Sequence, residues 1–287
     1  MMDTSVLVTV YMPTYNRASL LPRAIESVLN QTYQNIELIV VDDCSQDNTA
    51  EILAGFAKQD NRVRYFIQEK NSGACACRNK AIKEASGKFI TGLDDDDYFL
   101  PHRVEDFVYY WDKLEENKSC LFSTIKYNQD GVEVAGGVSR YIRKKMYVQQ
   151  KDMLTRNHLG NQVFAKTEDL LKIGGFDESM KIWQDFECFY RLLSLEKAIL
   201  IDNKSYIIDQ RHGFNRISAS KINILYDTYL YFCNKHKLNY LEKKILKESL
   251  VFYDKSFADL TSSILNFIYH PNKISLKNII FFGRSFL

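Results

Sequence analysis

Several absences in the 287-residue sequence narrow the kind of protein it encodes. Glycine and proline are scarce, with 12 and 4 residues, which excludes collagen-like and low-complexity chains. Lys and Arg total 38 against 36 for Asp and Glu, so no excess of positive charge predicts nucleic acid as a partner. No stretch reaches the ~20 uncharged apolar residues of a membrane span, and the N-terminus does not resemble a signal peptide. We therefore expect a folded, cytoplasmic protein.

The six cysteines also lack the spacing of a zinc site or a redox motif. None forms a C-x-x-C pair, and the single residue between Cys75 and Cys77 is too short for an ordinary zinc knuckle. We expect reduced thiols that pack as small apolar groups.

Apolar runs alternate with helical patterns through the first hundred residues. Strands are expected at 5–12, 36–41, 63–67 and 88–93, and helices at 18–30, 47–58 and 73–85, with the first strand ending at Pro13. This alternation predicts an α/β fold whose mainly parallel sheet is flanked by helices. Ligands bind beyond the carboxyl ends of such strands, so residues that follow different strands should meet in one crevice.

After Pro101 the pattern changes. A helix is expected at 103–116, a strand at 120–127 with a hairpin turn at Asp130-Gly131, and a short strand and helix at 162–166 and 168–173. A further helix at 183–195 carries acidic residues in its first turn, and the chain is helical from residue 218 onward.

Four consecutive aspartates, Asp94–Asp97, directly follow the apolar strand at 88–93. Ionised side by side, these carboxylates repel one another unless a cation neutralises them. Oxygen ligands of this kind suit Mg²⁺ or Mn²⁺, which also bind the phosphate oxygens of a substrate. A solvated acidic loop is the alternative, but the apolar segment after Asp97 returns the chain to the core at once and favours the metal site.

Together, six motifs in a fixed order resemble glycosyltransferase family 2, whose members have the GT-A fold. The resemblance covers roughly residues 5–220 and rests on the following segments: Pro13–Arg17, Val41–Thr49, Asn71–Gly73 with Ala76–Asn79, Leu93–Asp97 with Pro101, Gly174–Glu178, and Trp183–Asp185. It implies a GT-A domain at 1–217, with a nucleotide-sugar-binding half at 1–100 and an acceptor-binding half at 101–217. A C-terminal helical extension would follow at 218–287.

The resemblance assigns a donor-binding role to five residues: Pro13, Tyr15, Asp43, Arg78 and Asp95. Tyr15 would stack on the nucleotide base, Asp43 would accept the ring N–H of uracil, and Asp95 would face the ribose. Arg78 would meet a phosphate as a forked donor. The alternatives are a turn or helix-cap role for Asp43 and an exposed helical salt bridge for Arg78.

The same resemblance implies that Asp94, Asp96 and His212 bind Mn²⁺ or Mg²⁺, with the assignment inside the acidic run left open. His212 is equally consistent with an ordinary surface or packing residue. Asp185 corresponds to the general base, which takes the proton of the acceptor hydroxyl during an inverting transfer. The sequence has Gln184 where the family usually has glutamate, and Glu187 is an alternate base.

The resemblance therefore implies an inverting enzyme that moves a hexose or N-acetylhexosamine from a UDP-sugar to a saccharide acceptor with a β linkage. We expect a polyprenyl-diphosphate-linked glycan as the acceptor, in the synthesis of surface polysaccharide such as O-antigen or lipopolysaccharide. The basic, apolar segment 273–287 predicts either peripheral contact with the inner face of the plasma membrane or packing on the preceding helices. A nucleotidyltransferase and a non-catalytic saccharide-binding domain are the alternative functions.

Overall fold

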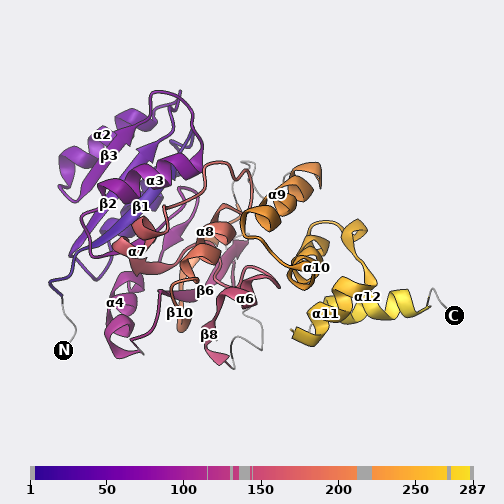
Figure 1. The fold of residues 1–287 in the computed structure, drawn as a ribbon. Coiled ribbons are helices and arrows are strands. Elements are labelled where there is room, and N and C mark those ends of the chain that lie inside the picture. The colour runs from indigo at the N-terminus through magenta and orange to yellow at the C-terminus, as the bar shows by residue number, and fades with distance from the viewer. Residues whose placement is uncertain are drawn as a thin grey trace.

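The computed structural model describes residues 4–114, 116–129, 132–135, 143, 145–211, 222–269 and 273–284. Figure 1 shows a strand-rich N-terminal part that continues into a group of helices near the C-terminus. The predicted α/β class is confirmed.

The first hundred residues alternate strands and helices as predicted, with bounds shifted by up to three residues. The elements are β1 (Val8–Thr14), α1 (Leu21–Leu29), β2 (Ile36–Asp42), α2 (Thr49–Gln59), β3 (Val63–Ile67), α3 (Ala74–Glu84), β4 (Phe89–Gly92) and β5 (Tyr98–Phe99).

The predicted end of the first strand at Pro13 is wrong. Pro13 lies inside β1 and pairs with Val41 of β2. On its other side β1 pairs with β4 only as far as Tyr11. Proline is tolerated here because that side of the strand needs no backbone donor beyond Tyr11.

The rest of the described chain adds further strands, among them the long β6 and β10, and most of the helices. These elements are α4 (Arg103–Lys113), β6 (Cys120–Gln129), β7 (Val132–Ala135), β8 (Tyr147–Val148), α6 (Gln150–Met153), β9 (Phe164–Lys166), α7 (Thr167–Lys172), α8 (Gln184–Leu192), β10 (Ala198–Asp209), α9 (Ile222–Lys235), α10 (Tyr240–Ser249), η2 (Leu250–Phe252), η3 (Lys255–Phe257), α11 (Leu260–Tyr269) and α12 (Lys273–Arg284).

All ten described strands belong to one mixed sheet in the order β3-β2-β1-β4-β9-β6-β10-β5, with β7 beside β6 and β8 beside β10. Strands β1 to β4 are parallel, as are β6 and β10. Strand β9 runs antiparallel to both neighbours and joins the two parallel groups. Because β1, β2 and β4 run the same way, the loops that follow them open on the same edge of the sheet.

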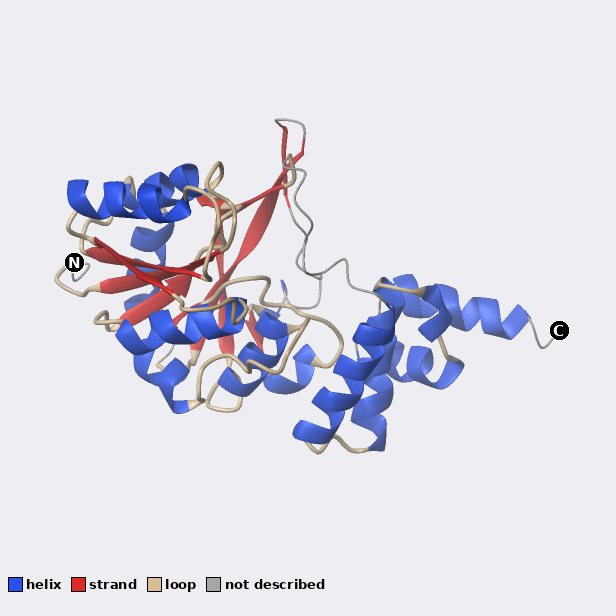
Figure 2. Cartoon of the chain, turned by 90° about the horizontal axis from the view of Figure 1, so that it is seen from above, coloured by secondary structure: helices blue, strands red, loops and turns tan. Residues whose placement is uncertain are grey.

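Helices cover both faces of this sheet, as Figure 2 shows. Val10 of β1 packs in a core that includes residues of α1, α2 and α4, whereas Tyr11 packs in a core with residues of α3, α7, α8 and α9. Successive side chains of a strand point to opposite faces, so a strand buried on both sides is a continuous apolar run. This explains the mainly apolar pattern of β1 and β2, in which Thr9 and Glu37 are also buried.

Helices α9 to α12 lie to one side of the sheet in both views. Helix α9 packs on α8, where Phe232 contacts the rings of Phe186 and Tyr190 at centroid distances of 5.1 and 5.0 Å. Among the described residues, no helix combines the length and the apolar character that crossing a bilayer requires.

Candidate active site

Residues at the ends of three parallel strands line one cleft of about 730 Å³. Pro13 and Tyr15 come from the end of β1, Asp43 follows β2, and the acidic loop (Asp94–Asp97) follows β4. Arg78 of α3 and Asp185 of α8 line the same cleft. The structure thus brings together every described residue that the sequence assigned to the site. His212 lies outside the described residues.

The acidic loop presents its carboxylates to different partners. Arg17 Nη1 lies 2.9 Å from Asp95 Oδ1 and 2.8 Å from Asp96 Oδ2. Burial raises the pKa of Asp95 to about 6, although the Arg17 guanidinium opposes that rise. Asp97 turns toward the sheet, where its Oδ1 accepts the backbone N–H of Asp209 at 3.1 Å. Asp97 therefore holds the loop against β10, while Asp94 to Asp96 are placed for a ligand.

Arg78 connects the acidic loop with α8. Its Nη2 donates to Asp94 Oδ1 at 3.0 Å and its Nη1 donates to Gln184 Oε1 at 2.8 Å. The guanidinium also lies over the Phe176 ring, 5.2 Å from its centroid. Burial by itself would lower the pKa of Arg78, but the carboxylates of Asp185 and Asp94 raise it. Arg78 is therefore a buried, permanent cation, and the alternative of an exposed helical salt bridge is wrong.

Asp185 lies in the first turn of α8, where a negative charge is favoured by the helix dipole. Its Oδ1 is buried and has no hydrogen-bond partner among the described residues. Burial raises the pKa of Asp185 to about 7 despite the nearby Arg78 guanidinium, and the Asp94 carboxylate adds to the rise. A carboxylate with this pKa can accept a proton near neutral pH, as a general base must.

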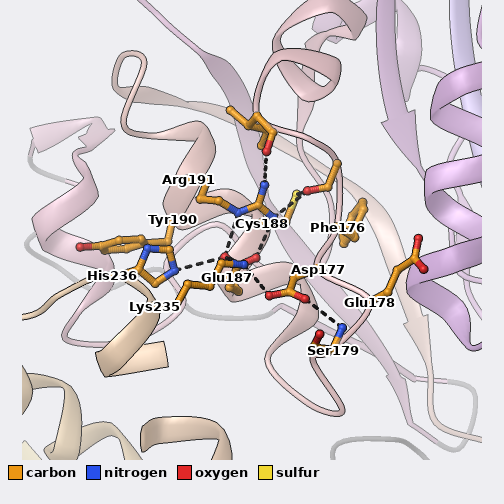
Figure 3. A network of polar contacts seen from close by, with 12 residues as sticks. Phe176, Asp177, Glu178, Ser179, Glu187, Cys188, Tyr190, Arg191, Lys235 and His236 are labelled. Carbon is orange, nitrogen blue, oxygen red and sulfur yellow. Dashed lines mark hydrogen bonds and ion pairs between the residues drawn. The ribbon is translucent and has the colours of Figure 1, made fainter. Parts of the chain in front are cut away.

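Glu187, the alternate base, has a different role. Its side chain is fully buried, is absent from the cleft lining, and accepts hydrogen bonds from Arg191 at 2.8 and 2.7 Å. Lys235 and His236 at the end of α9 approach the same carboxylate at 2.8 and 3.1 Å, as Figure 3 shows. This contact group joins α8 to α9.

The pKa of Glu187 reflects that contact group. Burial alone would raise it, but the hydrogen bonds from His236, Arg191 and Lys235 outweigh burial and hold the pKa well below its usual range. Glu187 therefore stays ionised and fixes the helix that presents Asp185.

Asp43 fixes the loop before α3. Its two carboxylate oxygens accept the backbone N–H groups of Ser72 at 2.7 Å and Gly73 at 2.8 Å. Gly73 has a φ of +88°, a backbone conformation that glycine adopts without strain. The turn role that the sequence left as an alternative is thus present, and base recognition by Asp43 stays a prediction. Tyr15 is 43% exposed, which leaves its ring accessible in the cleft.

The metal prediction can be tested against the donor set. The described residues include no group of three or more His, Cys, Asp or Glu side chains that could hold a metal ion. Mg²⁺ is commonly bound by only one or two carboxylates, with substrate phosphates and water as the remaining ligands. Asp94 and Asp96 supply two partly exposed carboxylates in a cleft large enough for such a substrate, so the residues present fit a hard divalent cation.

Comparison with known proteins identifies the chain. The sequence model of glycosyl transferase family 2 matches residues 9–166, which is more than half of the sequence. The chain belongs to glycosyl transferase family 2. It is accordingly a sugar-transferring enzyme, and the nucleotidyltransferase and non-catalytic alternatives are set aside.

This family 2 enzyme is similar to several bacterial proteins. It is 35% identical over 242 residues to Escherichia coli WcaA, named for colanic acid biosynthesis, and the match covers 82% of this chain and 83% of WcaA. Bacillus subtilis TuaG, named for teichuronic acid biosynthesis, is 38% identical over 128 residues, which cover 44% of this chain and 49% of TuaG.

Solved structures share the fold of the enzyme. Staphylococcus aureus TarS in complex with UDP-GlcNAc has a TM-score of 0.69 and 22% identity, over 95% of this chain and 78% of that one. The Pyrobaculum calidifontis mannosyltransferase PcManGT, in complex with GDP-Man and Mn²⁺, has a TM-score of 0.62 and 17% identity. The match covers 97% of this chain and 79% of PcManGT.

Several cleft residues were not assigned to the site from the sequence, among them Arg17, Gln184, Ser249 and Tyr253. Arg17 follows β1, so the rule that placed Tyr15 at the sheet edge also applied to it. In the sequence, Gln184 is only a departure from the usual glutamate. In the structure it accepts a hydrogen bond from Arg78. Ser249 and Tyr253 come from the C-terminal helices, and no local pattern signals their place in the cleft.

Proposed function

We propose that this glycosyltransferase moves a hexose or N-acetylhexosamine from a UDP-sugar to a saccharide acceptor by a single displacement that leaves a β linkage. One observation carries the proposal. The Asp185 carboxyl, whose pKa is raised to about 7, lines the same cleft as the acidic loop. A donor and an acceptor bound in this cleft would thus meet both a general base and a site for the departing diphosphate.

The donor half of the cleft suits a nucleoside diphosphate. The exposed ring of Tyr15 can stack on the base beside Pro13. An ionised carboxylate has about four acceptor positions, so Asp43 can hold Ser72 and Gly73 and still accept the N–H of uracil. The complex of TarS with UDP-GlcNAc supports a UDP-sugar as the donor class.

In this proposal Asp94 and Asp96 hold Mn²⁺ or Mg²⁺, which when bound stabilises the charge of the departing diphosphate. Arg78 is a permanent cation on the same side of the cleft and orients the phosphates as a forked donor. Asp95 faces the ribose.

Asp185 removes the proton of the acceptor hydroxyl as that oxygen attacks the anomeric carbon from the face opposite the leaving group. The new bond joins the acceptor oxygen to the anomeric carbon, and the bond from that carbon to the diphosphate oxygen breaks. UDP leaves with the electron pair of that bond, and Asp185 retains the proton until the product departs.

We further propose that the acceptor is a saccharide of surface polysaccharide synthesis, carried on a polyprenyl diphosphate at the cytoplasmic face of the membrane. The names of WcaA and TuaG support this class of product. In this proposal residues 1–217 form the catalytic domain, with its donor half at 1–100 and its acceptor half at 101–217. Residues 218–287 form the helical extension.

Helix α12 supports a peripheral contact between that extension and a membrane. Leu276, Ile280 and Phe281 are 42, 47 and 69% exposed, and Lys277 is exposed between them. An apolar surface with a neighbouring lysine suits the interface of an anionic bilayer. Deleting the residues after Pro271 should reduce sedimentation with anionic liposomes, and unchanged partitioning would refute the contact.

The catalytic proposal is tested by the release of nucleoside diphosphate from a panel of UDP-sugars and GDP-sugars with Mn²⁺. We expect the wild type to turn over one UDP-sugar that the Asp185→Asn variant does not turn over. NMR of the wild-type product should show a β linkage. An α linkage would exclude the single displacement, and turnover of GDP-sugars alone would refute the donor class.

A further inference from the structure

The C-terminal helices contribute to the active-site cleft although they lie outside the segment that matches the family. Ser249 ends α10 and Tyr253 follows η2, and both line the cleft that contains Asp185. Tyr253 is 53% exposed, so its ring is accessible to a ligand. The contacts of Glu187 with Lys235 and His236 fasten this part of the chain to α8.

Trp183 is a hydrogen-bond partner of Tyr253 and lines the same cleft. Its Nε1 donates to Tyr253 Oη at 3.3 Å, and its ring packs on Phe186 and Phe232 at centroid distances of 5.2 and 6.3 Å. Its φ of +61° is unfavourable for a residue with a bulky side chain. Such a conformation persists only where surrounding contacts enforce it, and it is common at ligand sites. The Trp183 indole is thus fixed two residues before Asp185.

Two linked aromatic rings with polar edges match the chemistry of a sugar ring. A pyranose has an apolar face of C–H groups and a rim of hydroxyls. Trp and Tyr likewise combine a large apolar face with one polar atom. The polar side chains of Asn157, Asn161 and Ser249 also line the cleft and can bond to hydroxyls. A nucleotide base could also stack here, but Tyr15 and Asp43 supply the base site on the donor side.

We propose that Trp183 and Tyr253 form the acceptor subsite, on which a pyranose ring stacks and directs one hydroxyl to Asp185. This inference rests on the proposed function. It means that the helical extension, through Tyr253, takes part with the α/β domain in selecting the acceptor saccharide.

Intrinsic fluorescence gives a readout that does not depend on turnover. The chain has two tryptophans, and Trp111 is buried beside Phe89, with ring centroids 4.8 Å apart. In a Trp111→Phe background, emission reports Trp183 alone. The full-length protein, saturated with UDP, is titrated with methyl β-glucoside, methyl β-galactoside and methyl N-acetyl-β-glucosaminide. We expect at least one glycoside to give a saturable change, and the absence of any change up to the solubility limit would overturn the subsite.

Tyr253→Ala should weaken binding of that glycoside about five- to tenfold and raise its KM as an acceptor by a similar factor. Tyr253→Phe, which keeps the ring and loses the bond to Trp183, should have a smaller effect. Tyr240→Ala is the matched control, because Tyr240 is 67% exposed on α10 and is absent from the cleft lining.

Acceptor-independent hydrolysis of the UDP-sugar separates this proposal from the function on which it rests. If hydrolysis and donor KM persist in Tyr253→Ala while acceptor KM rises, the subsite is supported. If Tyr253→Ala leaves acceptor binding and acceptor KM equal to those of Tyr240→Ala, the subsite is wrong although the enzyme is a UDP-sugar transferase. If the wild type releases no UDP from any UDP-sugar, with or without an acceptor glycoside, the proposed function itself fails.

Discussion

The two sides of the cleft are built by different means. On the donor side, Asp43 follows β2 and the acidic loop follows β4, the two parallel neighbours of β1, and the sheet itself sets their spacing. On the opposite side, Asp185 belongs to a helix that is fixed by the contacts of Glu187 with α9. The comparison teaches that the donor side depends on local chain geometry, whereas the position of Asp185, the proposed base, depends on contacts between segments that are distant in sequence.

The largest effect is expected on the donor side. Asp96→Ala removes one of two proposed metal ligands and should lower turnover at least about 10³-fold, because metal stabilisation of the leaving group contributes several kcal/mol. UDP release with Mn²⁺ measures this, and circular dichroism checks the fold. Near-normal turnover would contradict the metal assignment to Asp96.

A smaller loss of rate is expected on the opposite side. Asp185→Asn keeps the size of the side chain but cannot accept a proton, and loss of a general base costs about 10²- to 10⁴-fold. Binding of UDP, measured by calorimetry, should not change. Full turnover by this variant would show that the base lies elsewhere.

The contacts of Glu187 that hold the helix of Asp185 predict an effect on the free energy of unfolding. Glu187→Ala removes the carboxylate that Arg191, Lys235 and His236 share and should lower the free energy of unfolding by about 3 kcal/mol, because the cations of Arg191 and Lys235 lose their partner. Glu84→Ala breaks exposed pairs with Lys80 and Arg64 and should change the free energy of unfolding far less, because exposed ion pairs contribute little to stability. Urea unfolding compares the two variants. Equal losses would mean that the Glu187 contacts do not fasten α8 to α9.

The pH dependence of activity gives the smallest expected effect. Because the pKa of Asp185 is raised to about 7, kcat/KM should rise with pH and level off above about pH 7, with roughly a tenfold loss at pH 6. A profile that stays flat down to pH 5 would contradict the raised pKa.

The same shift predicts the sign of a stability change. Between about pH 4 and pH 7 the Asp185 carboxyl is protonated in the folded chain and ionised in the unfolded chain, so stability falls as pH rises through that window. Asp185→Asn should remove this contribution and unfold at a higher temperature than the wild type at pH 8. Thermal unfolding at pH 4.5 and pH 8 measures the difference.

Much of the donor side could be predicted because its pattern is local. Apolar runs that end in acidic residues locate strand ends, and parallel strands bring these ends to one edge. The predicted strand end at Pro13 was wrong, because β1 continues through Pro13 where β2 pairs with it and β4 does not. The same logic also missed Arg78 as a link between the acidic loop and α8, because its burial depends on Phe176 and Gln184, about a hundred residues away.

The sequence by itself determined the α/β alternation, the acidic loop and the order of the family motifs, because each depends on residues that are neighbours in the chain. Only the tertiary structure decided that Glu187 binds α9 rather than substrate, and that Tyr253 reaches Trp183 in the cleft. Those choices depend on which helix faces pack together, and packing is set by complementary shape and charge across the whole fold.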